Sequence, residues 1–113
     1  LRLSGIIDFY FACNEAFAYD LAIAINAWCF HTDFSFSTDL YNELLTSYQL
    51  VRQLTESEKA ALPMLCRAAA FRFFITRCYD WLNTSNEAQV HPKDPEEYIE
   101  KITFFRNAPR LFD

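Results

Sequence analysis

The run AFAYDLAIAINAWCF occupies residues 16–30 and contains a single charged side chain, Asp20. A helix built from this run is apolar on almost every side, and such a helix is typically buried inside a protein. We therefore predict a central helix from about Phe17 to Phe30, around which the rest of the chain packs.

The residues upstream of this helix, Leu3 to Phe9, are Ile-rich and interrupted by Gly5. This pattern predicts one strand with a turn near Ser4 and Gly5. A single strand is not independently stable, so we expect its partners to come from residues outside this chain. The opening Leu-Arg-Leu-Ser-Gly is not a signal peptide, and it indicates a piece of a longer protein.

The residues downstream of the central helix predict four further helical segments. Ser37 is a good N-cap for the first of them, and Thr55 and Glu58 have the form of a capping box at the second. The predicted segments are a helix from Ser37 to Val51, a short helical turn over Thr55–Glu58 that Pro63 interrupts or restarts, a long helix over Pro63–Leu82, a polar loop over Asn83–Pro92 and a last helix from Asp94 to Arg106. The predicted fold class is mainly α-helical with one edge strand at the N-terminus.

The composition of the 113 residues, 52% hydrophobic and 22% charged, fits one globular domain. The single glycine excludes glycine-rich phosphate loops, and a net charge of −5 without a basic run argues against nucleic acid. No uncharged apolar run reaches the roughly 18 residues of a membrane span. The four cysteines form no C-x-x-C pair, which favours a reducing, cytoplasmic location. His31 and His91 lack ligand-forming neighbours and are expected to be loop residues.

Two carboxylates twelve residues apart, Asp8 and Asp20, are the first candidates for chemistry. Asp8 follows the predicted strand, where a carboxylate suits Mg²⁺ bound to phosphate oxygens, although an Asp there is also a common turn former. Asp20 lies at the start of the apolar helix, where a buried carboxylate needs a partner. Its simplest role is that of a structural cap.

The strand ending in Ile-Asp-Phe, with Asp-Leu-Ala twelve residues after its Asp, resembles the carboxyl lobe of the aminoglycoside phosphotransferase and choline kinase superfamily, the small-molecule relatives of protein kinases. Within it, the segments IIDFYFACNEAFAYDLAIAINAWCF, FRFFITRCYDWLN and HPKDPEEYIEKITFFRN resemble the bacterial homoserine kinase family. The resemblance covers residues 1–113. It implies the helical, substrate-side C-terminal lobe of a protein-kinase-like fold, with the nucleotide lobe and the catalytic loop absent from this chain.

By this resemblance, Asp8 matches the metal-binding Asp of the kinase Asp-Phe-Gly motif, and Asp20 matches a helix Asp that supports the catalytic loop. The third motif position is Tyr10 and not Gly, which argues against a mobile kinase-style switch. The resemblance also implies ATP as co-substrate, Mg²⁺ as cofactor and a role in threonine synthesis. Because the Lys that anchors ATP and the His-Gly-Asp loop precede this segment in the family, we expect the isolated chain to be inactive.

A second candidate site lies on one face of the predicted long helix. Its members are Phe73, Arg77, Asp80 and Trp81, with Arg72 nearby. A guanidinium beside a carboxylate suits a zwitterion such as homoserine, because Arg binds a carboxylate and Asp accepts from an ammonium group. The alternatives are an Arg77–Asp80 pair within the helix, or an Arg that donates to a buried backbone carbonyl.

Asn26 and Trp28 lie near the end of the central helix, where the family's acceptor site is expected. A buried amide needs hydrogen-bond partners, which makes Asn26 a candidate, whereas Trp28 also fits a core position. On the last helix, the acidic residues are expected to face solvent and three apolar residues to face inward. The acidic residues are Glu96, Glu97 and Glu100, and the apolar residues are Ile99, Ile102 and Phe105.

These observations predict that the complete protein transfers the γ-phosphoryl group of ATP to the hydroxyl of L-homoserine. An alternative acceptor is choline, ethanolamine or an aminoglycoside-like alcohol, but Arg72 and Arg77 favour an acceptor that carries a carboxylate. The alternative from another class is a non-catalytic helical interaction module, in which the surplus of aromatic residues supplies a docking face.

Overall fold

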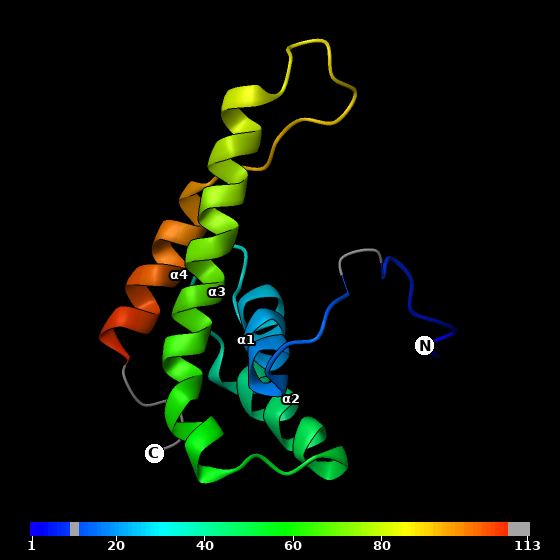
Figure 1. Cartoon of the computed structure of the whole chain (residues 1–113), viewed down its shortest axis with the longest axis vertical. Coiled ribbons are helices and arrows are strands. Elements are labelled where there is room, and N and C mark those ends of the chain that lie inside the picture. Colours follow the sequence, from blue (N-terminus) through cyan, green and yellow to red (C-terminus); the bar gives the residue numbers. More distant parts are fainter. Residues whose placement is uncertain (10–11, 109–113) are drawn as a thin grey trace.

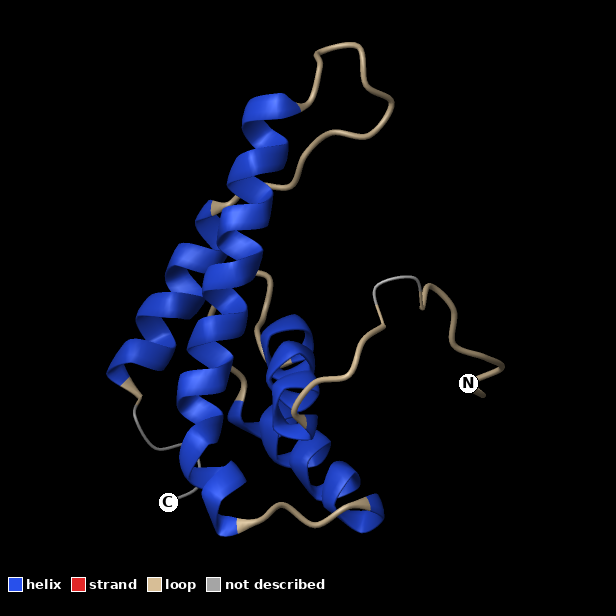
Figure 2. Ribbon diagram, in the orientation of Figure 1, coloured by secondary structure: helices blue, strands red, loops and turns tan. Residues whose placement is uncertain are grey.

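The computed structural model describes residues 1–9 and 12–108 of the chain. Four helices form in this part, α1 (Phe17–Trp28), α2 (Thr38–Val51), α3 (Glu56–Asn83) and α4 (Glu96–Asn107). The long helix α3 packs against both α1 and α4, and α2 contacts α1 (Figure 1). Loops join the helices, and no strand lies among the described residues (Figure 2). The predicted mainly α-helical class is therefore confirmed. None of the described helices has the length and apolar content that crossing a lipid bilayer requires.

The hydrophobic core receives side chains from all four helices. Its buried members are Leu21, Ala22, Ile25, Cys29, Tyr41, Leu54, Leu62, Cys66 and Phe105. Phe36 stacks on Phe104 beside this core, with ring centroids 4.5 Å apart. Burial of each large aliphatic side chain contributes about 1.5–3 kcal/mol, so the α1 run supplies a substantial share of the stability.

Two of the four cysteines behave as small apolar core residues. Cys29 and Cys66 are both fully buried. Burial raises the pKa of the Cys29 thiol to about 11. It raises the pKa of the Cys66 thiol as well, so both thiols stay protonated and unreactive at neutral pH.

The helix starts follow the predicted capping residues. Ser37 accepts a hydrogen bond from the Leu40 amide at 3.3 Å. At the start of α3 the Glu58 amide donates to Thr55 Oγ1 at 3.2 Å, and the Thr55 amide donates to Glu58 Oε2 at 2.9 Å, which completes the capping box. The expected break at Pro63 is wrong, because Pro63 lies inside α3, which runs without a break over 28 residues from Glu56 to Asn83. Pro63 costs one backbone hydrogen bond, but its ring is buried in the interior.

The predicted inward face of the last helix is confirmed only in part, because Phe105 is buried as expected but Ile99 is not. Tyr98 and Lys101 are buried, whereas Ile99, which was expected to face inward, is 46% exposed. Asp94 precedes the N-cap residue Pro95, and its Oδ1 still accepts from the Glu96 amide at 2.8 Å.

The predicted strand over Leu3–Phe9 is not formed. Residues 1–9 are exposed and have no regular secondary structure. Asp8 has a φ of 76°, which is incompatible with an extended strand at that residue. The segment runs away from the helices in Figure 1, and no neighbouring strand is present among the described residues to pair with it. Tyr10 lies outside the described residues.

Candidate functional site

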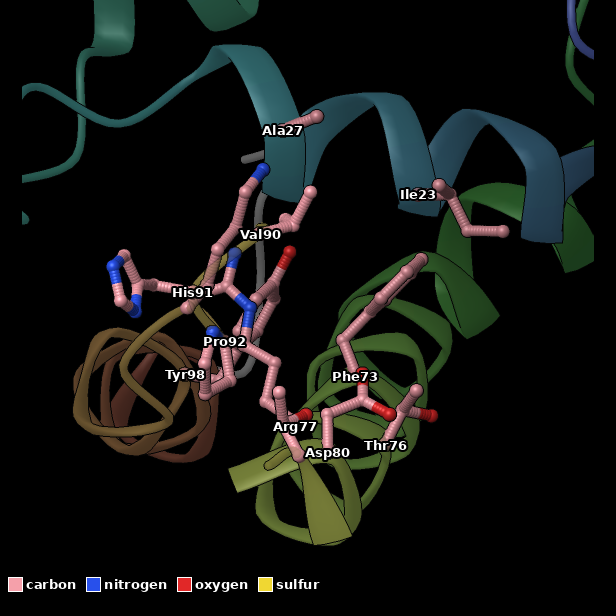
Figure 3. A pocket seen from close by; sticks show the side chains of 12 residues that line it. Ile23, Ala27, Phe73, Thr76, Arg77, Asp80, Val90, His91, Pro92 and Tyr98 are labelled. Atoms are coloured by element: carbon pink, nitrogen blue, oxygen red, sulfur yellow. The ribbon is translucent and has the colours of Figure 1, made fainter. Parts of the chain in front are cut away.

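A cleft of about 600 Å³ lies between α1, α3, the start of α4 and the loop that joins α3 to α4. Figure 3 shows how its side chains converge from these elements. It is lined by Ile23, Ala27, Phe73, Thr76, Arg77, Asp80, Thr84, Val90, His91, Pro92, Lys93 and Tyr98. The wall thus combines apolar side chains with two cations and one carboxylate, a composition that suits a small polar ligand.

The cleft brings together three residues of the second candidate site. Phe73, Arg77 and Asp80 lie on one face of α3 and line the cleft as the helical spacing predicts. Arg72 and Trp81 do not line it, because at about 100° per residue each falls about 40° beyond one edge of the α3 face that lines the cleft.

The two candidates near the end of α1 differ in burial. Asn26 is 1% exposed, whereas Trp28 is 66% exposed, so the alternative core position for Trp28 is wrong. Asn26 Nδ2 donates to the carbonyls of Ala22 and Cys66, both at 2.9 Å, and thereby joins α1 to α3. Its Oδ1 is buried and has no hydrogen-bond partner among the described residues. Neither residue lines the cleft.

Arg77 is held in place by residues that follow it in the chain. Its Nη1 donates to Glu97 Oε2 at 2.6 Å and to the Asp94 carbonyl at 3.0 Å. The guanidinium carbon also lies 4.4 Å from the centroid of the Tyr98 ring. The alternative Arg77–Asp80 pair is therefore not formed. Arg77 does donate to a backbone carbonyl, but that carbonyl belongs to the exposed residue Asp94, so the alternative of a buried carbonyl partner is wrong for Arg77.

Glu97 does not simply face solvent as expected, because it joins two cations. Its second oxygen, Oε1, accepts from Lys101 Nζ at 2.6 Å. The Lys101 side chain is 3% exposed, and its Nζ also donates to the backbone carbonyl of Asn26 at 2.7 Å. Burial opposes ionisation of Glu97, but the hydrogen bonds from Lys101 and Arg77 outweigh it, so the pKa of Glu97 lies below its ordinary value.

The two carboxylates of the first candidate site are both exposed. Asp8 lies in the extended N-terminal segment, and Asp20 lies in the first turn of α1 with its side chain toward solvent. The expectation that Asp20 is buried is wrong, because the apolar residues of α1 that enter the core lie on its other faces. No group of three or more metal-ligating side chains exists among the described residues.

Sequence reasoning missed the cleft residues that follow α3. Lys93 comes from the segment that precedes α4, and Tyr98 enters from the first turns of α4. Neither residue carried a local sequence signal for the cleft, since the position of this segment against α1 and α3 depends on tertiary packing. The acidic residues around Glu97 indicated a solvent-facing helix surface, so the burial of Lys101 was not predicted either.

Comparison with known proteins assigns the chain to a family. Residues 1–58 match the phosphotransferase enzyme family. The chain belongs to this family. The matched range contains both Asp8 and Asp20.

Individual phosphotransferases extend the similarity beyond α2. A homoserine kinase from Granulibacter bethesdensis is 54% identical over 108 residues, which is 96% of this chain and 34% of that protein. A homoserine kinase from Methylobacterium radiotolerans is 56% identical over 106 residues, 94% of this chain and 33% of that protein. One from Bradyrhizobium diazoefficiens is 52% identical over 112 residues, 99% of this chain. The chain thus spans about a third of the length of these curated relatives, and the similarity includes the helices that form the cleft.

Proposed function

We propose that this chain is the helical, substrate-side part of an ATP-dependent kinase that phosphorylates the hydroxyl of L-homoserine. The observation that carries this proposal is the identity of more than half of the residues to homoserine kinases over nearly the whole chain. In the reaction, the acceptor oxygen forms a bond to the γ-phosphorus of ATP while the bond to the ADP oxygen breaks, and the hydroxyl proton is released. A cytoplasmic role in threonine synthesis fits this chemistry.

The cleft is our proposed binding site for the amino-acid end of the acceptor. Both hydrogen bonds that Arg77 donates to the protein leave from Nη1, so Nη2 and Nε have no acceptor among the described residues. That free edge can bind the acceptor carboxylate through charge-assisted hydrogen bonds. Asp80 lines the same cleft and is exposed, so its carboxylate can accept from the ammonium group. Choline and ethanolamine lack the carboxylate that Arg77 would bind.

The remaining predicted site residues take other places in this proposal. Asn26 does not line the cleft, but it joins α1 to α3, two of the helices that form its walls. Trp28, Arg72 and Trp81 also lie outside the cleft. We infer from the family match that Asp8 contributes one ligand to the Mg²⁺ that accompanies ATP, and that Asp20 supports the catalytic loop. Both roles require residues beyond those described, since Asp8 alone is a single exposed carboxylate.

The decisive experiment is a phosphoryl-transfer assay of the full-length protein with ATP and a panel of acceptors. The panel contains L-homoserine, L-serine, choline, ethanolamine and an aminoglycoside. We expect the highest kcat/KM for L-homoserine. A preference for choline, ethanolamine or the aminoglycoside would overturn the proposed acceptor, and no transfer to any acceptor would overturn the kinase assignment. In the same assay Asp80→Asn should raise the KM for homoserine without changing the KM for ATP.

A further inference from the structure

Glu97 connects the proposed acceptor cleft to a buried lysine. Each of its carboxylate oxygens accepts from one cation at 2.6 Å, Oε2 from Arg77 on α3 and Oε1 from Lys101 on the same helix α4. Lys101 is anchored in turn by the backbone carbonyl of Asn26 near the end of α1. Three helices are therefore tied together at one carboxylate.

Lys101 holds this carboxylate in one place. The ammonium group lies 5.1 Å from the Phe30 ring centroid and 4.6 Å from the Tyr98 ring centroid, in addition to its two hydrogen bonds. A lysine that is almost fully buried needs such compensation, and its loss of rotamer freedom is part of the cost of folding. The hydrogen bond from Lys101 therefore restricts the positions that the Glu97 carboxylate can adopt, even when the Arg77 side chain moves.

The guanidinium of Arg77 is correspondingly fixed through Nη1, while Nη2 and Nε have no acceptor among the described residues. Nη1 is occupied by Glu97 and by the Asp94 carbonyl, and Tyr98 supports the flat face of the group. A planar guanidinium fixed on one side presents Nη2 and Nε in a defined direction. Together with Lys93 and Asp80 of the cleft wall, Arg77, Lys101 and Glu97 carry a net charge of one positive unit, which favours an anionic ligand.

We propose that Glu97 is a positioning residue, which is braced by Lys101 and orients the Arg77 guanidinium to bind the carboxylate of the amino-acid acceptor. This inference rests on the proposed function, because it takes the acceptor to be an amino acid bound in the cleft. Pre-orientation lowers the cost of binding, since less side-chain freedom is lost when the acceptor arrives.

The test uses the full-length protein and two acceptors that differ only in the carboxylate. These are L-homoserine and 3-amino-1-propanol, which is used as an acceptor or as a competitive inhibitor. We expect Glu97→Gln to weaken the binding of homoserine about tenfold, which corresponds to about 1.4 kcal/mol. The kcat and the KM for ATP should change less than about twofold, and the binding of 3-amino-1-propanol should not change.

The matched control is Glu58→Gln. Glu58 forms a comparable ion pair with Arg52 at 2.7 Å, and neither residue lines the cleft. This variant should lower the thermal midpoint without changing the KM for homoserine. If Glu97 had only a structural role, Glu97→Gln would behave in the same way, and that result would overturn the inference. If Glu97→Gln folds poorly, Glu97→Asp keeps the charge and should restore part of the affinity for homoserine but leave 3-amino-1-propanol unaffected.

Arg77→Gln separates this inference from the proposed function. Loss of homoserine affinity in Arg77→Gln together with unchanged affinity in Glu97→Gln and Glu97→Asp would overturn only the positioning role. Unchanged affinity in Arg77→Gln would instead remove the cleft from the acceptor site, and with it the proposed function of these residues.

Discussion

At the scale of single residues, Lys101 shows why a charge pattern alone does not locate a side chain. It stands in a helix rich in Glu, and the amphipathic pattern favours solvent for all of these charges. Instead, Lys101 is 2% exposed because Glu97, one turn earlier, and the Asn26 carbonyl of another helix both accept from it. The partner from α1 lies 75 positions away in the sequence, so no local window includes it.

We therefore expect Lys101→Met to be strongly destabilising. The substitution keeps most of the apolar stem but leaves the Asn26 carbonyl without its donor and Glu97 with one cation. Removing one partner of a buried ion pair costs about 3 kcal/mol or more. The measurement is thermal unfolding of the full-length variant against the parent protein.

The control for this substitution is Lys59→Met. Lys59 pairs with Glu56 at 2.8 Å, but the side chain of Glu56 is 90% exposed. An exposed pair contributes at most about 1 kcal/mol, so the midpoint should barely move. Equal losses of stability in the two variants would contradict the buried network.

At the scale of secondary structure, the existence and the starts of the helices were easier to predict from the sequence than the full length of α3 and the buried faces of the helices. Ser37 and Thr55 cap helices as predicted, because capping depends on residues within one turn. Pro63 does not end α3, since the buried environment of its ring compensates for the missing hydrogen bond. Val51, the last residue of α2, is 92% exposed although it is apolar, because packing and not residue type decides which end of a helix reaches the core.

The first turn of α3 gives a pH-dependent prediction. The hydrogen bond from Arg52, followed by that from the Thr55 amide, lowers the pKa of Glu58 to about 2. A carboxylate with a depressed pKa stabilises the folded state above its ordinary pKa of about 4.5, and this stability is lost as the pH falls toward 2. The Glu58→Gln variant lacks this titration.

We therefore expect the parent protein to exceed Glu58→Gln in thermal midpoint at pH 6, and this difference to shrink as the pH is lowered from 4.5 to 3. The measurement is a series of thermal melts of both proteins across this range. High salt should reduce the difference at pH 6, because Arg52 and Glu58 are partly exposed. A difference that stays constant down to pH 3 would show that Glu58 does not titrate with a depressed pKa.

At the scale of the whole molecule, one face of α3 remains without contacts to the other helices. Its buried side contains Leu62, Cys66 and Ala70, whereas its exposed apolar residues recur at steps of seven, four and seven positions, which places them about 180° away. They are Met64, Phe71, Ile75 and Leu82. Large apolar residues in the N-terminal segment are exposed as well, among them Ile6, Ile7 and Phe9.

Some parts of this arrangement were predictable from the sequence, and others were not. The cleft face of α3 followed from the spacing of Phe73, Arg77 and Asp80, because these residues lie on one rigid helix. The strand at Leu3–Phe9 did not form, because a strand needs a partner and the described chain supplies none. Local elements are thus predictable from local sequence, whereas sheet pairing and sites assembled from several elements depend on distant residues.

The dependence of assembled sites on distant residues also predicts how the 113-residue chain behaves by itself. Phosphoryl transfer depends on the simultaneous positioning of ATP, metal ion and acceptor, and the chain spans only about a third of the length of the homoserine kinases it matches. We expect the isolated chain to show no transfer from ATP to homoserine and to bind a hydrophobic dye through its exposed apolar side chains more strongly than the full-length protein. Circular dichroism should confirm that the isolated chain is helical, so that inactivity is not a consequence of unfolding. Turnover by the helical isolated chain would contradict this expectation and would require that residues 1–113 contain a complete phosphotransfer site.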